Sequence, residues 1–228
     1  MTYLVSIVLS FISVVVVSII CTHARLSKNG SKIEQNVMEM SSHKIRSFIS
    51  IDIDKPEIVE KIKRVQGLFK DKNTRIKLVE PENLHLTLRF LGEISANEVE
   101  EIISALSKIQ DKSFSIYLKN LGAFPSIPRA RVVWIGVSEG ADRLKELSHK
   151  VNTIIDSLRI GYKDSKEFTP HLTIGRIKSK PSQRLIKTLL ENSDVDIGKV
   201  EVKDFRLKQS ILTPRGPIYK TLHSFKLL

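Results

Sequence analysis

The chain has 228 residues, 41% of them hydrophobic, so it can bury a sizeable core as one domain or as two closely packed lobes. Its formal charge of +12 favours an anionic partner such as nucleic acid or a membrane surface, although a basic face kept only for solvation also fits that charge. The single cysteine, Cys21, excludes an intrachain disulfide and a cysteine-based metal cluster, and favours a reducing, cytoplasmic location.

Residues 1–39 differ from the rest of the chain and are predicted to form a hydrophobic segment followed by a linker. Nineteen uncharged residues, from Tyr3 to Cys21, are just long enough to span a bilayer as a helix. Basic residues between positions 25 and 32 would then keep the C-terminal bulk in the cytoplasm. The alternative is a misassigned start, with translation beginning at Met38 or Met40.

Residues 44–228 are predicted to form the folded domain. A buried strand beginning at Ile45 precedes a helix over 56–69, with Pro56 in its first turn. The strand "HLTLRFLG" comes next, and a helix over 95–109 begins with a capping box of Ser95 and Glu98. A strand over 114–121 and the loop "GAFPSIPRA" complete the first half.

The second half repeats this order, with a strand over 132–137, a helix over 142–158, the strand "HLTIGRIK" and a short helix after Pro181. Two strands over 200–207 and 218–227 close the chain, with "TPRG" as the turn. Features recur at an offset of 86 residues; Phe48, for example, falls on Trp134. We therefore predict a bilobal, pseudo-twofold α+β fold in which two antiparallel sheets face a central cleft, with helices outside.

The motif His-Leu-Thr-aliphatic occurs twice, at residues 85–88 and 171–174, in a chain with six histidines. Roughly 0.3 His-x-Thr sequences are expected by chance at this composition. Side chains at i and i+2 share a strand face, so each motif presents an imidazole and a hydroxyl together while its aliphatic residues enter the core. If a twofold axis passes through the cleft, His85 and His171 oppose each other across one small group.

Two opposed imidazoles suit a displacement at phosphorus. Histidine titrates near ~6.5, so one ring can deprotonate the incoming water while the other protonates the oxygen leaving in line. Thr87 and Thr173 would donate to the equatorial oxygens. No metal is required, and two histidines without further ligands make a weak metal site. A purely structural role for the histidines suits one motif alone better than two motifs at equivalent positions.

The motifs, extended as "HLTLRFLGE" and "FTPHLTIGRIK", occur with "PENLHLT", "GAFPSIPRARVVWIGV" and "LKQSILTPRGPIY". Together they resemble the RNA 2′,3′-cyclic phosphodiesterases of the 2H phosphoesterase superfamily, also called the 2′-5′ RNA ligase family. The resemblance covers about residues 44–228 and not the first 39. It implies the bilobal 2H phosphoesterase fold, a positively charged cleft and hydrolysis of RNA 2′,3′-cyclic phosphate ends to 2′-phosphomonoesters without metal or cofactor, together with 2′-5′ ligase activity.

The same resemblance assigns roles to the matching residues. It makes His85 the proton donor to the departing 3′ oxygen and His171 the proton acceptor that activates water. Thr87 and Thr173 would bind the phosphate, and Arg176 would hold the phosphate or the adjacent nucleotide.

Further substrate-binding candidates are Arg89, Phe168 and Tyr219. Arg89, four residues after His85, shares the catalytic face if its strand is regular, although it falls on Gly175 and not on Arg176 at the offset of 86. Arg176 reaches the cleft only if Gly175 permits a bulge or the strand ends there. Phe168 and Tyr219 are candidates for stacking on a base, with packing in the core as the alternative.

The predicted partner is RNA with a 2′,3′-cyclic phosphate end, tRNA fragments among the candidates, bound by a monomeric protein. The basic charge favours RNA because phosphates beyond the scissile one gain contacts with Lys and Arg. Two alternatives stay open: a 2H phosphodiesterase of small cyclic nucleotides, and a non-catalytic protein that binds RNA ends. A membrane-tethered adaptor depends wholly on residues 3–21.

Overall fold

The computed structural model describes residues 44–162, 168–214 and 216–228, and Ile45–Leu228 forms one folded unit. The hydrophobic segment predicted to be a membrane anchor, and both alternative start methionines, lie outside the described residues. Within the described ranges, every helix is too short or too polar to cross a bilayer.

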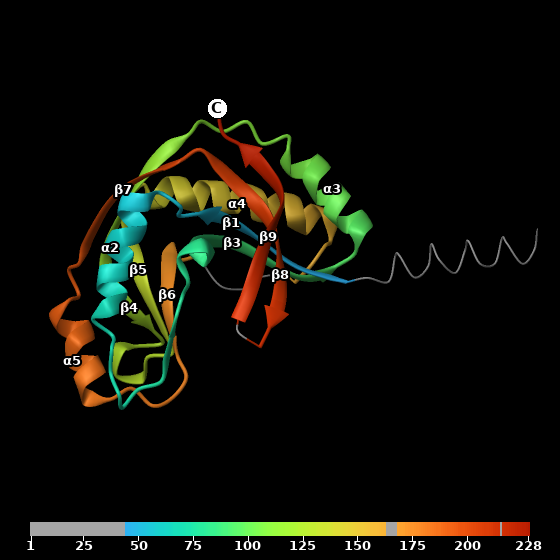
Figure 1. Cartoon of the computed structure of the whole chain (residues 1–228). Coiled ribbons are helices and arrows are strands. Elements are labelled where there is room, and N and C mark those ends of the chain that lie inside the picture. Colours follow the sequence, from blue (N-terminus) through green and yellow to red (C-terminus); the bar gives the residue numbers. More distant parts are fainter. Residues whose placement is uncertain (1–43, 163–167, 215) are drawn as a thin grey trace, which may run out of the picture. The chain divides into compact units, whose positions relative to one another are not determined.

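The helices of the folded unit are α2 (Pro56–Gly67), α3 (Ala96–Leu106), α4 (Ala141–Leu158) and α5 (Gln183–Glu191), with 3-10 turns at Pro81–Asn83 and Ile127–Arg129. The strands are β1 (Ile45–Asp52), β2 (Ile76–Leu78), β3 (His85–Ile94), β4 (Phe114–Phe124), β5 (Val132–Glu139), β6 (His171–Ile177), β7 (Asp196–Val202), β8 (Asp204–Thr213) and β9 (Gly216–Lys226). Figure 1 shows their arrangement.

The helix starts follow the local signals in the sequence. Pro56 occupies the first turn of α2, where its missing N–H would have had no partner in the helix. At α3 the Ser95 hydroxyl accepts from the backbone N–H of Glu98 at 3.3 Å, while the Ser95 N–H donates to the Glu98 carboxylate at 2.6 Å. The predicted capping box is therefore confirmed, as is a helix in each predicted place.

The strands form antiparallel ladders in the order β7-β4-β5-β6-β3-β1-β8-β9, and β2 pairs with β6. In the middle of this order β3 and β6 meet at one register pair, Leu86 opposite Leu172. The two predicted sheets are thus joined at a narrow seam, and the α+β class is confirmed. We call β3, β1, β8 and β9 the His85 lobe, and β6, β5, β4 and β7 the His171 lobe.

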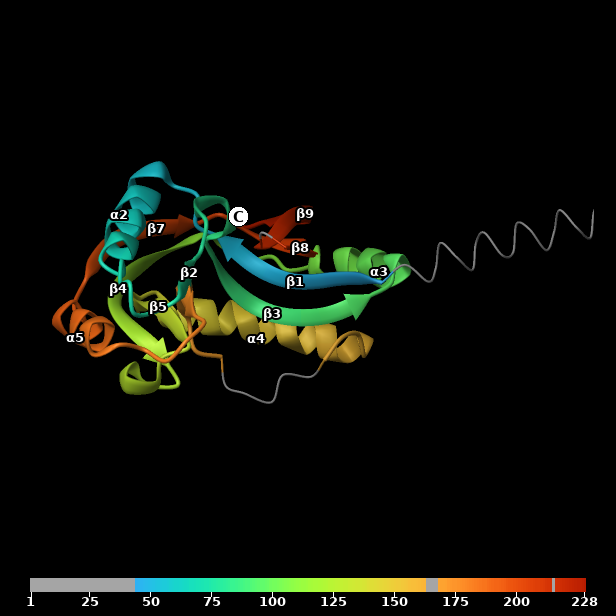
Figure 2. The same ribbon diagram turned by 60° about the horizontal axis from the view of Figure 1, so that its bottom comes forward.

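The two lobes do not follow the two halves of the sequence. Strand β4, from the first half, pairs with β5 in the His171 lobe, whereas β8, near the C-terminus, pairs with β1 in the His85 lobe. Helix α2 packs against β6 and β7, and α4 runs along β3 (Figure 2). The strand predicted over 200–207 is divided between β7 and β8, because the chain crosses from one lobe to the other at Lys203.

Candidate active site

The seam between the lobes positions both His-x-Thr motifs. Leu86 and Leu172 are fully buried, so the residues on either side of them point to the opposite face of the sheet. Antiparallel register at this pair sets His85 opposite Thr173 and Thr87 opposite His171. The two histidines are then diagonal neighbours, whose Cα atoms are roughly 7–8 Å apart in a regular ladder.

Both motifs line one cavity of about 1620 Å³. The imidazoles of His85 and His171 and the side chains of Thr87 and Thr173 are partly exposed and contribute to its wall. Within the described part of the chain neither threonine hydroxyl makes a hydrogen bond to protein. A small ligand at the seam could therefore contact two imidazoles and accept from two hydroxyl donors.

The backbone fixes both imidazoles in the same way. Nδ1 of His85 lies 2.7 Å from the carbonyl oxygen of Asn83, and Nδ1 of His171 lies 2.7 Å from that of Thr169. A carbonyl can only accept, so Nδ1 carries the proton that is donated, and Nε2 remains available for a ligand. The last carbonyl of the Pro81–Asn83 turn is free to serve His85 in this role.

Aromatic rings pack against each imidazole. The ring centroids of Phe48 and Tyr219 lie 5.0 and 5.2 Å from that of His85. Those of Phe124 and Trp134 lie 5.1 and 6.5 Å from that of His171. The equivalence of Phe48 and Trp134 was expected from the offset of 86. The contribution of Phe124 was missed because residue 124 was expected in the loop after a strand over 114–121, whereas β4 extends to Phe124.

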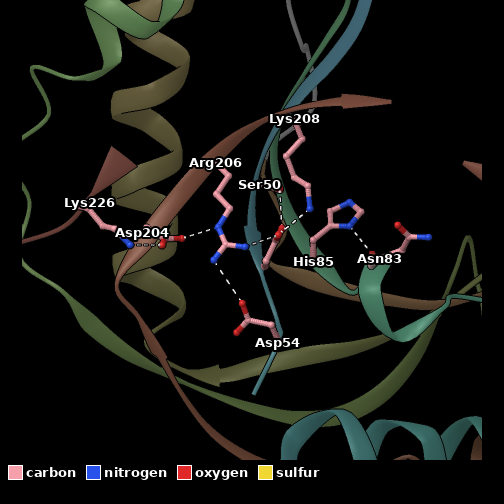
Figure 3. A network of polar contacts seen from close by, with 9 residues as sticks. Ser50, Asp54, Asn83, His85, Asp204, Arg206, Lys208 and Lys226 are labelled. Carbon is pink, nitrogen blue, oxygen red and sulfur yellow. Dashed lines mark hydrogen bonds and ion pairs between the residues drawn. The ribbon is translucent and has the colours of Figure 1, made fainter. Parts of the chain in front are cut away.

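A network of charges that the sequence did not predict lies behind His85 (Figure 3). Asp52 is opposite His85 in the β1–β3 ladder, and its carboxylate pairs with Lys208 and Arg206, each at 2.7 Å. The Lys208 side chain is only 4% exposed. Figure 3 shows its ammonium group beside the imidazole of His85, so a buried cation is part of that histidine's environment.

These surroundings lower the pKa of His85 from 6.5 to about 4. Burial is the largest cause, because it penalises the charged imidazolium, and the positive charges of Lys208 and Arg176 add to it. The hydrogen bond to Asn83 and the charge of Asp52 act in the opposite direction. His85 is therefore neutral at physiological pH when the cleft holds no anion.

Each strand that carries a motif has a β-bulge directly after His-x-Thr. Leu88 of β3 has no partner in the β1 ladder, and Ile174 of β6 has none in the β5 ladder. Each bulge reverses the alternation of side chains, which returns Arg176 in β6 and Phe90 in β3 to the cavity face, where both are exposed. The bulge that the sequence required for Arg176 is thus present.

Arg176 extends toward the other lobe. Its charge acts on the titration of both His85 and Tyr219, which belong to the His85 lobe. One cavity thereby holds a cation, two imidazoles and two hydroxyls drawn from both strands, an arrangement that suits a phosphate group.

The expectation that Arg89 faces the ligand needs correction. Its guanidinium donates to Asn152 at 2.7 Å and to Asp156 at 2.8 Å, both on α4, and its side chain is 2% exposed. The bulge at Leu88 removes the regular alternation on which the expectation depended. Arg89 borders the cavity, but its guanidinium bonds to α4 and so holds that helix against β3.

The two predicted aromatic contacts both line the cavity. Phe168 is partly buried and packs against the hydrophobic core. Tyr219 lies edge-on to His85, and burial raises the pKa of its phenol, so the hydroxyl keeps its proton. Across the ranges that the structure covers, no group of three His, Cys, Asp or Glu residues is arranged to hold a metal ion.

Comparison with known proteins places this site in a family. The sequence profile of the LigT like Phosphoesterase family matches the chain twice, over residues 51–134 and 135–219. A protein of Aeropyrum pernix named RNA 2′,3′-cyclic phosphodiesterase is 44% identical over 171 residues, which are 74% of this chain and 96% of the relative. A protein of Archaeoglobus fulgidus with the same name is 41% identical, over 80% of this chain and 100% of the relative.

Solved structures agree with the sequence comparison. The crystal structure of the Thermus thermophilus protein TT0787 superposes with a TM-score of 0.68 at 26% identity, covering 80% of this chain and 97% of that one. The apo form of E. coli LigT gives a TM-score of 0.65 at 25% identity, covering 82% and 99%. The chain belongs to the LigT-like phosphoesterase family.

Proposed function

We propose that this chain hydrolyses the 2′,3′-cyclic phosphate at the 3′ end of RNA to a 2′-phosphomonoester, using His85 and His171 as acid and base. The observation that carries the proposal is the seam, which sets two imidazoles diagonally across one cavity with both Nε2 atoms available. The names of the relatives from A. pernix and A. fulgidus support the reaction.

The reaction needs one proton to be taken up and one to be given. Nε2 of His171 removes a proton from water as its oxygen attacks phosphorus, and Nε2 of His85 protonates the 3′ oxygen as the P–O3′ bond breaks. Thr87, Thr173 and Arg176 stabilise the non-bridging oxygens, on which negative charge accumulates. The phosphate stays on the 2′ oxygen, and proton exchange with solvent restores both rings.

The low pKa of His85 fits the role of acid. The imidazolium is scarce in the free enzyme, but it is a strong acid and transfers its proton readily to an oxygen on which negative charge develops. A bound phosphodiester brings a negative charge against the ring, which offsets the penalty of burial and the charges of Lys208 and Arg176.

The surroundings of the cleft favour RNA over a small cyclic nucleotide. The cavity, at about 1620 Å³, exceeds the ~300–1,000 Å³ typical of small-molecule sites. Three exposed basic residues line it: Lys77, Arg176 and Lys178. Exposed Arg75 and Arg131 lie beside them, because their backbone carbonyls accept from the N–H groups of Lys178 and Ile177. Such a basic surface suits the additional phosphates of an oligonucleotide, with tRNA fragments among the candidate substrates.

We also propose the conditions under which the enzyme works: residues 44–228 carry the activity as a monomer, without metal or cofactor, in the cytoplasm. The same displacement joins RNA ends through a 2′-5′ linkage when a 5′ hydroxyl takes the place of water, attacking phosphorus as the P–O3′ bond breaks.

We expect the pH profile of kcat/KM to be bell-shaped with its acidic limb near pH 4, because kcat/KM reports the pKa values of the free enzyme and that of His85 is about 4. Below this limb no neutral imidazole is left to act as base, and above the alkaline limb no imidazolium is left to act as acid. The Lys208→Met variant should move the acidic limb to higher pH. An acidic limb near the ordinary ~6.5 of histidine would contradict the predicted environment.

The function is tested by incubating the full chain with a short oligonucleotide that ends in a 2′,3′-cyclic phosphate. Mass spectrometry against synthetic 2′- and 3′-phosphate standards identifies the product, and a cyclic mononucleotide serves as the competing substrate. We expect a 2′-phosphate and a higher kcat/KM for the oligonucleotide. A 3′-phosphate, or binding without hydrolysis, would refute the proposal, and a preference for the mononucleotide would select the small-nucleotide alternative.

A further inference from the structure

We infer that Gln66 is a positioning residue for Arg176: its side-chain amide holds the β-bulge at Ile174, which turns Arg176 toward the cavity. The inference rests on the proposed function and adds to it a residue that acts on the substrate through Arg176. Gln66 lies on α2, is only 5% exposed and does not line the cavity.

The Gln66 amide makes two hydrogen bonds inside the protein. Its Nε2 donates to the carbonyl oxygen of Ile174 at 2.9 Å and to that of Val79, directly after β2, at 2.8 Å. The N–H of Val79 donates to the same Ile174 oxygen at 3.0 Å. A primary amide carries two donor hydrogens, so Gln66 uses both of them to join the end of β2 to the bulge.

The bulge at Ile174 needs support of this kind. Ile174 has no partner residue in the β5 ladder, and a buried carbonyl without a hydrogen bond is costly. Gln66 and Val79 satisfy that carbonyl in the bulged conformation. Without the bulge, Arg176, five residues after His171, would fall on the opposite face of β6.

Strand β2 gives Gln66 a second task. Lys77 is opposite Arg176 in the β2–β6 ladder, and both side chains line the cavity. Like charges directly opposite each other destabilise an antiparallel pair, and β2 is only three residues long. The hydrogen bond from Gln66 to Val79 fixes the chain two residues beyond Lys77, so it opposes this repulsion and keeps β2 on β6 before a phosphate arrives.

The other lobe contains the counterpart of this contact. Gln66 and Asn152 are separated by 86 residues, the offset of the two motifs. Asn152, on α4, donates to the hydroxyl of Ser148 at 3.1 Å, and that hydroxyl donates to the carbonyl oxygen of Leu88, the bulged residue of β3, at 3.3 Å. An amide at the same position of the repeat thus supports the bulge in each lobe, directly from Gln66 and by way of Ser148 from Asn152.

The test is a double-mutant cycle between Gln66→Met and Arg176→Gln, measured as kcat/KM on a cyclic-phosphate oligonucleotide. Met nearly keeps the volume of Gln and removes both donors. In the unaltered background, Gln66→Met should lower kcat/KM by roughly 10- to 100-fold, the cost of misplacing a binding group by about 1 Å. With Arg176→Gln already present, it should lower kcat/KM by less than about twofold, because the residue that it positions is gone.

Two controls separate positioning from a loss of stability. Ile58→Val truncates a buried side chain of α2 that lies over Gly198 in β7, so it should lower the melting temperature and leave kcat/KM unchanged. In a Lys178→Gln background, Gln66→Met should keep its full effect, because the charge removed is not the one that Gln66 positions. Gln66→His keeps a ring N–H donor and, as the milder variant, carries the same cycle if Gln66→Met does not fold.

The outcomes separate this inference from the proposed function. Equal losses from Gln66→Met with and without Arg176 would refute the positioning role and leave the proposed function standing. If the unaltered chain does not hydrolyse the oligonucleotide, the proposed function fails, and the cycle is measured instead as the Kd of inorganic phosphate by calorimetry. Gln66→Met should then weaken phosphate binding only when Arg176 is present, and equal weakening in both backgrounds would overturn the inference.

Discussion

Alanine at His85 or at His171 should lower kcat by several orders of magnitude, because each variant removes one of the two proposed proton transfers. A positioned acid or base typically contributes ~10²- to 10⁴-fold. Both histidines make one hydrogen bond to the backbone and are partly exposed, so truncation leaves the core intact and the loss is specific to catalysis. Single-turnover hydrolysis of a cyclic-phosphate oligonucleotide measures the effect.

His223→Ala is the matched control for these variants. His223 lies on β9, packs at 4.7 Å against the ring of Phe225, and does not line the cavity, so its loss should leave kcat unchanged. EDTA should likewise have no effect on the unaltered chain. Wild-type rates in either active-site variant, or hydrolysis that EDTA abolishes, would contradict the two-histidine mechanism.

The second large effect is expected at Arg176. Arg176→Gln should lower kcat/KM by roughly 10²- to 10³-fold, the usual cost of removing one donor from developing negative charge. The side chain is exposed, and among the described residues its guanidinium pairs with no carboxylate, so thermal stability should not change. Steady-state kinetics and a thermal melt on the same preparation measure both quantities.

Lys178→Gln is the control for Arg176. Lys178 is exposed just beyond β6, two residues farther along the chain from His171 than Arg176, so we expect it to contact the outer phosphates of an oligonucleotide. Its loss should therefore weaken binding at low salt and leave kcat unchanged. Equal losses in the two variants would show that Arg176 contributes general charge and has no specific role at the scissile phosphate.

The helices and the motif strands were predictable because their signals are local. Apolar spacing, Pro56 in the first turn of α2 and the capping box of Ser95 each act within a few residues. The orientation of both His-x-Thr motifs follows from strand alternation combined with buried Leu86 and Leu172. Such features depend little on which distant strand pairs with them.

The misplacement of Arg89 has a specific cause. Regular alternation puts Arg89 on the face of His85, whereas the offset of 86 equates it with Gly175 and equates Phe90 with Arg176. The structure agrees with the offset: Phe90 and Arg176 are exposed on the cavity face and Arg89 is buried, because each strand has a bulge between the His-x-Thr motif and these positions. A bulge is visible only in the pairing of two strands, so one strand's sequence could not reveal it.

Non-local pairing also explains what else was missed. The repeat shows which segments resemble each other, but it does not say which lobe a strand joins, and β4 and β8 join the lobe of the opposite half. The low pKa of His85 depends on its burial and on the positive charge of Lys208, which meets His85 from strand β8, far along the chain. No local pattern in the sequence encodes that meeting.

The most direct test of the assigned roles uses a substrate whose 3′ oxygen is replaced by sulfur. A thiolate leaves with little help from an acid, since thiols titrate near ~8.5, so His85→Ala should hydrolyse this substrate at a rate close to that of the unaltered chain. His171→Ala should remain inactive, because water must still lose a proton. Equal impairment of His85→Ala on the sulfur and oxygen substrates, or rescue of His171→Ala in its place, would contradict the assignment of acid and base to opposite sides of one phosphorus.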